Sequence, residues 1–434
     1  MSEATTSTAS KGSASVDKPR WRQRVELWYL AYALLGATMA GLAPILLPLT
    51  VSRSGNAADV GLAMAAFNLG GLTAPVWGSL ADRYRLHRRL LAGGLAVTAV
   101  GLAVFGFATV PLAWFSLALL TSIGAAASAT VANLFIVEAH PQSEWDERIG
   151  WLQTFYGAGQ VVGLSLAGVL SQVDLRGGVW VAAALTAAAI LPGWLATHTP
   201  TELLTPRPVL LHPARQGEWA HGSPQRLFHH VNLTALKQSR SALLSPFGLF
   251  LLTWLLSFGG AAALFSLYPV WMQQVFAIEP GLSSLAFAVA AGLGLALYAP
   301  AGVWSEHAGP NRVLKIGMGL RLIAFLSLSI LALTHSNLTG WLALSSFAII
   351  VLAWSLLSVS GTAITARIAP VGEGPGMGIF NGITAIAGVA GAALGGWMAG
   401  RLGYAAVSVF AAVGAACGLS LALVIQPMRL GTKQ

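Results

Sequence analysis

The chain has 434 residues, a length that would usually suggest two or three soluble domains. Its composition excludes that class, because only 9% of the residues are charged, 56% are hydrophobic and the mean hydropathy is +0.70. A water-soluble protein of this size could not cover its surface with so few charges. The sequence therefore predicts a polytopic membrane protein, and no nucleic-acid partner is expected despite an isoelectric point of about 10.1.

Long apolar runs recur along the chain, and each is close to the roughly 20 residues that a helix needs to cross a bilayer. They are rich in leucine and alanine and lack the alternation of barrel strands, so they predict an all-α membrane protein. The twelve predicted spans are 26–50, 58–81, 89–109, 112–139, 149–172, 178–198, 244–274, 281–304, 313–334, 338–367, 376–399 and 402–426.

Polar segments divide these spans into two sets of six. The predicted division is a disordered tail (1–25), a six-helix bundle (26–198), a linker (199–243), a second six-helix bundle (244–426) and a second tail (427–434). The linker contains histidines, among them His212, His229 and His230, but their spacing matches no metal-ligand pattern. A solvated linker is therefore favoured over a metal-sensing one, and no cofactor or metal is expected.

The positive charges give the predicted orientation. All but four of the 24 lysines and arginines lie in segments that share one side with both termini; the exceptions are Arg53, Arg176, Arg321 and Arg401. Loops that face the cytoplasm carry this excess, so both termini and the linker are predicted to be cytoplasmic. The compact loops favour a bacterial inner (plasma) membrane.

Two short patterns occur in both halves at nearly the same offset, which indicates a duplicated six-helix unit. Gly78-Ser-Leu-Ala-Asp82, followed by arginines, has its counterpart in Gly302-Val-Trp-Ser-Glu306. The Gly159-x-x-x-Gly163 run of the fifth span has its counterpart in the Ala387-x-x-x-Gly391 run of the eleventh.

The first of these patterns resembles a family signature. The stretch GSLADRYRLHRR, from Gly78 to Arg89, is similar to the signature between the second and third helices of the major facilitator superfamily. Arg85 stands where that family usually has a second glycine. With twelve spans and a duplicated unit, the resemblance covers nearly the whole chain. It implies two pseudo-symmetric bundles around a central cavity that opens alternately to either side.

The resemblance also implies a gate at the helix ends near this motif. Its expected members are Gly78, Asp82, Arg83, Arg88, Glu138, Glu306 and Arg367. Asp82 is expected to meet the positive end of the eleventh helix in the outward-facing state, a contact worth up to about 2 kcal/mol. Glu138 is expected to pair with Arg83 or Arg88, and the two second-half residues with each other. The alternative is that these charges only anchor helix ends, but the motif favours the gate.

Glycines in the fifth span resemble a pattern of antiporter-type exporters, although Leu164 and Ala167 stand where that pattern has proline and glycine. Small residues also allow close helix packing, and both interpretations stay open. The expected packing set is Gly159, Gly163, Gly168, Gly391 and Gly395. No acidic residue lies near the middle of a predicted span, so no proton relay is visible, and coupling to a proton or another ion is left open.

A few polar residues within the spans are candidates for a substrate cavity: Gln153, Tyr156, Asn381, Asn133 and Asn68. Gln153 and Asn381 occupy equivalent places in the two halves, which makes a symmetric pair of amides one hypothesis and interhelical hydrogen bonding the other. Arg321 would suit an anionic substrate, but the resemblance places the ninth helix at the periphery. Snorkelling of Arg321 toward the cytoplasm is therefore favoured.

The leading functional prediction is a monomeric secondary active or facilitative transporter that moves small organic molecules across the bilayer by alternating access. Export of drugs or metabolites is favoured over uptake of a sugar, an organic anion or another metabolite. A membrane assembly or sensor protein with the same fold is the alternative of another class. An enzyme is not expected, because no nucleophile and base, phosphate loop or metal site is recognisable in the sequence.

Overall fold

The structure is a computed structural model that describes residues 25–84, 86–141, 144–196, 245–333, 339–370 and 373–424. The predicted all-α class is confirmed, because every regular element in these ranges is a helix. The first half holds α2 (Tyr29–Gly36), η1 (Ala37–Leu42), α3 (Ala43–Ser52), α4 (Ala57–Leu69), η2 (Gly70–Thr73), α5 (Ala74–Tyr84), α6 (His87–Phe105), α7 (Pro111–Ala139), α8 (Trp145–Val173) and α9 (Leu175–Ala196). The second half holds α13 (Pro246–Phe276), α14 (Pro280–Ala308), α15 (Pro310–Leu331), α16 (Thr339–Ile368), α17 (Glu373–Leu402) and α18 (Ala405–Val424).

Twelve helical segments of the described chain are long and apolar enough to cross a membrane, as predicted. The first consists of α2, the π-helical turn η1 and α3, and the second of α4, the 3-10 turn η2 and α5. Pro44 and Pro75 follow these irregular turns, and each lacks the amide proton that a regular helix would need there. The predicted tails and linker, including the linker histidines, lie outside the described residues except for Val25.

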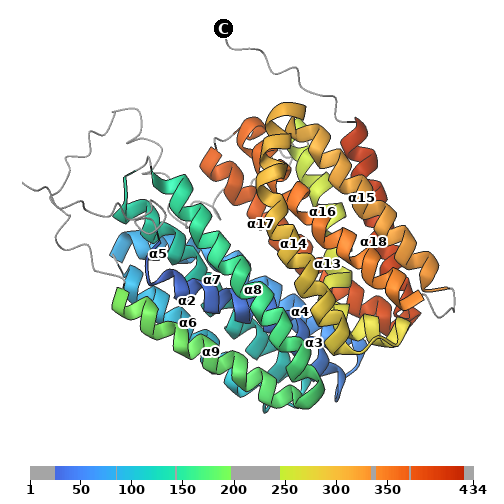
Figure 1. The fold of residues 1–434 in the computed structure, drawn as a ribbon, viewed down its shortest axis with the longest axis horizontal. Coiled ribbons are helices and arrows are strands. Elements are labelled where there is room, and N and C mark those ends of the chain that lie inside the picture. Colours follow the sequence, from blue (N-terminus) through green and yellow to red (C-terminus); the bar gives the residue numbers. More distant parts are fainter. Residues whose placement is uncertain are drawn as a thin grey trace, which may run out of the picture.

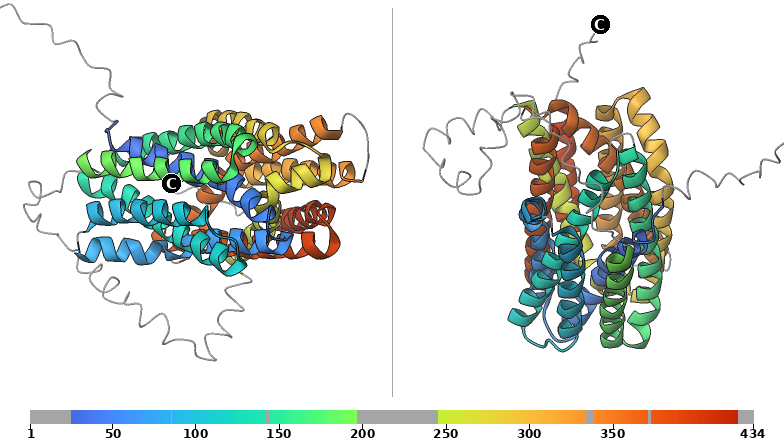
Figure 2. Two further views of the ribbon diagram at one scale, coloured as in Figure 1. Left: turned by 90° about the horizontal axis from the view of Figure 1, so that it is seen from below. Right: turned by 90° about the vertical axis from the view of Figure 1, so that its left-hand side faces the viewer.

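The helices of each half pack mainly among themselves, and the two halves lie side by side (Figures 1 and 2). The halves meet where α4 packs against α17, α8 against α14, and α3 against α13. We call the side where α5 ends at Tyr84 and α14 ends at Ala308 the motif side. The opposite side is where α3 ends at Ser52 and α13 at Phe276.

Short connections keep consecutive helices antiparallel. Asn56 caps α4. Its side-chain oxygen accepts a hydrogen bond from the backbone amide of Asp59 at 3.0 Å, and the Asp59 carboxylate accepts one from the backbone amide of Asn56 at 2.9 Å. Gly309 and Gly403 turn the chain between α14 and α15 and between α17 and α18, with φ of 85° and 87°. A side chain would strain the backbone at these angles.

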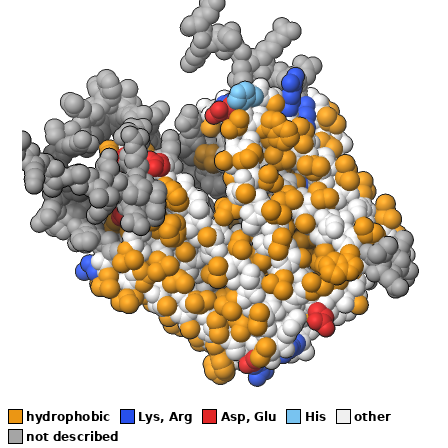
Figure 3. All heavy atoms as spheres, in the orientation of Figure 1, with side chains coloured by type: hydrophobic (Ala, Val, Ile, Leu, Met, Phe, Trp, Pro, Cys, Tyr) orange, Lys and Arg blue, Asp and Glu red, His pale blue; other side chains and the backbone are white. Residues whose placement is uncertain are grey.

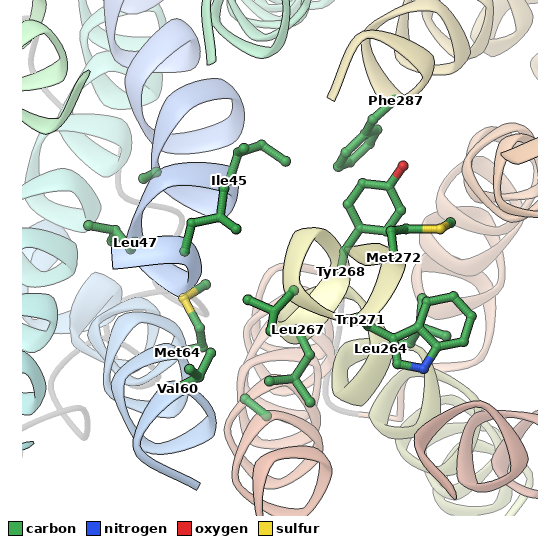
Figure 4. Close-up of a cluster of buried hydrophobic side chains, with 14 of the residues drawn as sticks. Ile45, Leu47, Val60, Met64, Leu264, Leu267, Tyr268, Trp271, Met272 and Phe287 are labelled. Atoms are coloured by element: carbon green, nitrogen blue, oxygen red, sulfur yellow. The ribbon is translucent and has the colours of Figure 1, made fainter. Parts of the chain in front are cut away.

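A large core of buried hydrophobic side chains spans both halves toward the opposite side. Figure 4 shows Ile45 of α3 and Met64 of α4 lying across from Leu267 of α13. Nearby, the Tyr268 hydroxyl donates a hydrogen bond to the Ser283 carbonyl at 2.8 Å, and its ring stacks on Phe347. This core joins the two halves away from the motif side.

The outer surface is suited to lipid. Figure 3 shows a face covered mainly by hydrophobic side chains, with charged side chains at its two ends. Val100, Ile323 and Val413, which lie well inside their helices, are 58%, 65% and 54% exposed. An apolar belt of this kind, between two charged ends, is what a membrane-spanning bundle presents to the acyl chains.

Candidate functional site

The two halves enclose a cavity of about 860 Å³, within the range of small-molecule binding sites. Its walls come from the first, second and fifth membrane-spanning segments of one half and from α13, α14, α15 and α16 of the other. The polar side chains among its described lining residues are Asn68, Gln153, Thr154, Tyr156, Gln160, Ser266, Tyr298, Arg321 and Ser355.

The contacts between the halves are concentrated on the opposite side. There Gly61 of α4 packs so closely on Gly396 of α17 that neither position has room for a Cβ atom. The Ser284 hydroxyl of α14 donates a hydrogen bond to the Leu164 carbonyl of α8 at 2.7 Å. Toward the motif side, residues of the same α8 and α14 helices are exposed and line the cavity, as Tyr298 does at 37% exposure. The cavity therefore opens toward the motif side.

Three of the predicted cavity residues, Asn68, Gln153 and Tyr156, line this cavity. Asn133 is not among the lining residues, although its side-chain oxygen lies 3.5 Å from the Gln153 amide nitrogen. Its own amide donates to the Ala129 carbonyl at 2.8 Å. Asn381 is exposed and does not line the cavity, so the structure does not bring the symmetric amide pair together there.

Aromatic side chains dominate the second-half wall, and sequence reasoning had not singled out its phenylalanines. Phe258, Phe265, Phe287 and Trp354 all line the cavity. The rings of Phe258 and Trp354 lie 5.5 Å apart. Single phenylalanines in apolar spans carry no sequence signal that separates a cavity wall from the core or from the lipid face.

The structure contradicts the expectation that Arg321 snorkels at the periphery. Its side chain is buried, at 2% exposure, and lines the cavity. Its guanidinium carbon lies 5.7 Å from the centre of the Trp354 ring, within the range of a cation–π contact. α15 itself packs mainly on α16 and α18, and Arg321 is the one residue of α15 among the described lining residues of the cavity. The long side chain therefore reaches the cavity although its helix packs mainly on these two neighbours.

The predicted packing glycines all lie at helix contacts. A Cβ atom at Gly159 or Gly163 would collide with the Ala33 or Ala37 carbonyl of the first span. Gly391 and Gly395 of α17 meet α13 in the same way, which repeats the arrangement in the second half. Gly168 instead faces α14, where a Cβ atom would lie 3.0 Å from the Gly281 carbonyl oxygen. Close packing alone thus accounts for small residues at these positions.

The expected gate residues lie on the motif side. A Cβ atom at Gly78 would be 3.7 Å from Thr130 of α7, and the Arg88 guanidinium carbon lies 4.1 Å from the centre of the Trp194 ring. Glu306 and Arg367 are both exposed, and no ion pair joins these two described side chains, contrary to the expected pairing. The side chains of Asp82, Arg83 and Glu138 lie outside the described residues, so their pairings stay predictions.

A charged network on the motif side was missed from the sequence. Arg148 donates from Nη1 to Glu26 at 2.8 Å and from Nε to Glu144 at 2.9 Å. Glu26 also lies 2.8 Å from His140 Nε2 and accepts a hydrogen bond from the Trp28 indole at 2.9 Å. Burial lowers the pKa of His140 and outweighs the opposing effect of the Glu26 carboxylate. The network ties the start of the first span to the loop between α7 and α8.

Known proteins share this architecture. A point mutant of the nucleoside transporter NupG superposes with a TM-score of 0.71 at 14% identity, over 93% of this chain and 100% of that chain. A bacterial homologue of the human lysosomal transporter Spinster gives 0.68 at 15% identity, over 94% and 97%. The xylose transporter XylE from E. coli gives 0.65 at 13% identity, over 93% and 98%.

At such low identity these superpositions show the fold alone. A search of curated proteins finds no match. The family model of the Major Facilitator Superfamily, however, matches residues 28–373, which is most of the chain. Together with the twelve spans and the central cavity, this match shows that the chain is a transporter of the Major Facilitator Superfamily.

Proposed function

We propose that this protein carries small organic molecules across the bilayer by alternating access, and that the structure represents its inward-open state. The observation that carries the proposal is the one-sided opening of the cavity, since the halves touch on the opposite side and separate toward the motif side. A cavity at a pseudo-symmetric interface, open to one side at a time, is the arrangement that alternating access requires.

The motif side is proposed to be cytoplasmic because the lysines and arginines concentrate there, and a bacterial inner membrane remains the proposed location. Export is favoured over uptake, because the largely apolar and aromatic wall suits an amphipathic compound that partitions from the inner leaflet. The glycines of α8 no longer add to that preference, since helix packing accounts for them. Uptake of a sugar, a nucleoside or an organic anion is the alternative.

A disulfide across the closed side tests alternating access directly. The Ser284 Cβ atom lies 3.6 Å from the Cβ position at Gly168, which is suitable for a disulfide between α8 and α14. Gly168→Cys and Ser284→Cys would be combined with Cys417→Ser, since Cys417 is the chain's only cysteine. We expect oxidation to stop transport by holding the opposite side closed, and a reductant to restore it.

Transport would be measured in proteoliposomes, with and without a pH gradient, for 2-naphthoate, xylose, uridine and rhodamine 6G. The matched control is Ala31→Cys with Gly193→Cys, whose Cβ positions are also 3.6 Å apart but lie in one half. Cross-linking this control pair should leave transport intact, because each half moves as a unit. Undiminished transport by the fully cross-linked Gly168→Cys/Ser284→Cys protein would refute the proposal.

A further inference from the structure

The charge of the cavity is unbalanced. Among the described residues that line it, Arg321 alone carries a charge, and no aspartate or glutamate is present among them. Arg321 forms neither an ion pair nor a hydrogen bond with any side chain or carbonyl of the described chain, and its Nε atom is buried without a partner. Its guanidinium lies instead over the face of the Trp354 ring.

A buried guanidinium without a counter-charge is unfavourable. The group keeps its proton when it is buried, so the protein cannot remove the cost by neutralising it. Contact with an indole ring offsets part of the lost hydration but satisfies none of the five N–H donors. Arginine in a membrane interior normally pairs with an acid or a carbonyl, and here that partner is missing from the described residues. An anionic ligand in the cavity would supply it.

The surroundings of Arg321 indicate what else the ligand carries. Trp354 and Phe258 form an aromatic wall next to the guanidinium, with ring centres 5.5 Å apart. On the first half, Gln153 and Gln160 offer neutral amides that can act as donors or acceptors. The cavity therefore offers one cation, an aromatic surface beside it and uncharged polar groups across from it.

We infer that the cavity binds an amphipathic organic anion, with a carboxylate or a similar group on Arg321 and an aromatic or apolar body against Trp354 and Phe258. The inference rests on the proposed transport function and names its substrate class. It disfavours lipophilic cations, since a cation in this cavity would meet Arg321 without any described acid to balance it.

A set of three ligands of nearly equal shape tests the charge preference: 2-naphthoate, 2-naphthamide and 2-naphthylmethylammonium. Their binding to the full-length protein in detergent would be measured by titration calorimetry, beside counterflow in proteoliposomes. We expect wild type to bind the anion at least about tenfold more tightly than the amide, which corresponds to about 1.4 kcal/mol, and to bind the ammonium compound most weakly.

Variants then assign the preference to a residue. Arg321→Gln should abolish the preference for the anion over the amide, whereas Arg321→Lys should keep part of it without the forked donor geometry. Trp354→Leu should weaken the binding of anion and amide alike. Arg312→Gln is the matched control, because Arg312 is an exposed arginine on the same helix, and it should behave as wild type. If Arg321→Gln does not fold, the graded loss in Arg321→Lys carries the test.

Equal binding of the three ligands, or a preference for the ammonium compound, would overturn the inference and leave the transport function standing. The same holds if Arg321→Gln retains the tenfold preference. If none of the three binds, the comparison moves to whichever panel compound wild type transports. A neutral or cationic substrate that Arg321→Gln still transports overturns the inference, and an anion that only wild type and Arg312→Gln transport supports it. If wild type transports no compound at all, the proposed function fails with it.

Discussion

Replacing Arg148 by methionine should destabilise the first half, because the Arg148 guanidinium donates to the carboxylates of both Glu26 and Glu144. Its side chain is 9% exposed, while Glu26 and Glu144 are 32% and 24% exposed. Removing one partner of a fully buried ion pair costs about 3–5 kcal/mol. Here the two carboxylates are partly hydrated and Glu26 keeps His140 and Trp28 as neighbours, so we expect a smaller loss of about 2 kcal/mol.

The loss would be measured as a shift in thermal unfolding of the purified protein in detergent. For a unit of this size, about 2 kcal/mol lowers the Tm by roughly 4–8 °C. Glu26→Gln in the Arg148→Met background should recover part of the stability, because a neutral amide costs less to bury than a carboxylate that has lost its arginine partner. Arg312→Met, at an exposed site, is the control and should change the free energy of unfolding by less than about 0.5 kcal/mol. An Arg148→Met protein as stable as wild type, or strict additivity in the double variant, would refute the reasoning.

Three further predictions concern pH, packing and the gate. Burial lowers the pKa of His140 below 6.5, so the stability that neutral His140 contributes is complete above that pH and declines as the pH falls below it. Acidification from pH 7.5 to 5.5 should therefore lower the Tm of wild type more than that of His140→Gln, and equal shifts would contradict this. Gly163→Ala should cost about 1–3 kcal/mol in thermal unfolding, whereas Gly319→Ala, whose Cβ would meet nothing within 4 Å, should be neutral or mildly stabilising; similar losses at both sites would argue against the packing role. Asp82→Asn should abolish transport in proteoliposomes while membrane expression stays normal, and undiminished flux would remove Asp82 from the gate.

The membrane class and the number of spans were predictable because burial in lipid leaves a one-dimensional pattern in the sequence. Part of the cavity was predictable from the spacing of polar residues along one helix. Gln153, Tyr156 and Gln160 are spaced so that they share one face of a helix, and that face lines the cavity. The match between Gln153 and Asn381 predicted less, because α8 lines the cavity whereas α17 contributes none of its described lining residues, and Asn381 is exposed.

The predictions that were wrong or missing concern contacts between side chains that lie far apart in the sequence. Arg321 was recognised as a candidate for binding an anion, but the expected peripheral place of its helix did not show that its long side chain lines the cavity. The pair of Arg148 and Glu26 joins positions 122 residues apart, which no local pattern can show. Glu144 and Arg148, by contrast, have the four-residue spacing of a helical ion pair and could have been found.

The closed side of the cavity has a consequence for how the transporter responds to its surroundings. Within the described chain, the close contacts between α4 and α17 and between α8 and α14 involve glycines, backbone atoms and uncharged side chains such as Asn68, Gln172, Ser284 and Leu285, and no ion pair crosses there. Dispersion forces of this kind fade within an ångström or so of separation, whereas mobile ions in the solvent screen charges and leave dispersion untouched. Opening of this side should therefore be abrupt and nearly independent of ionic strength.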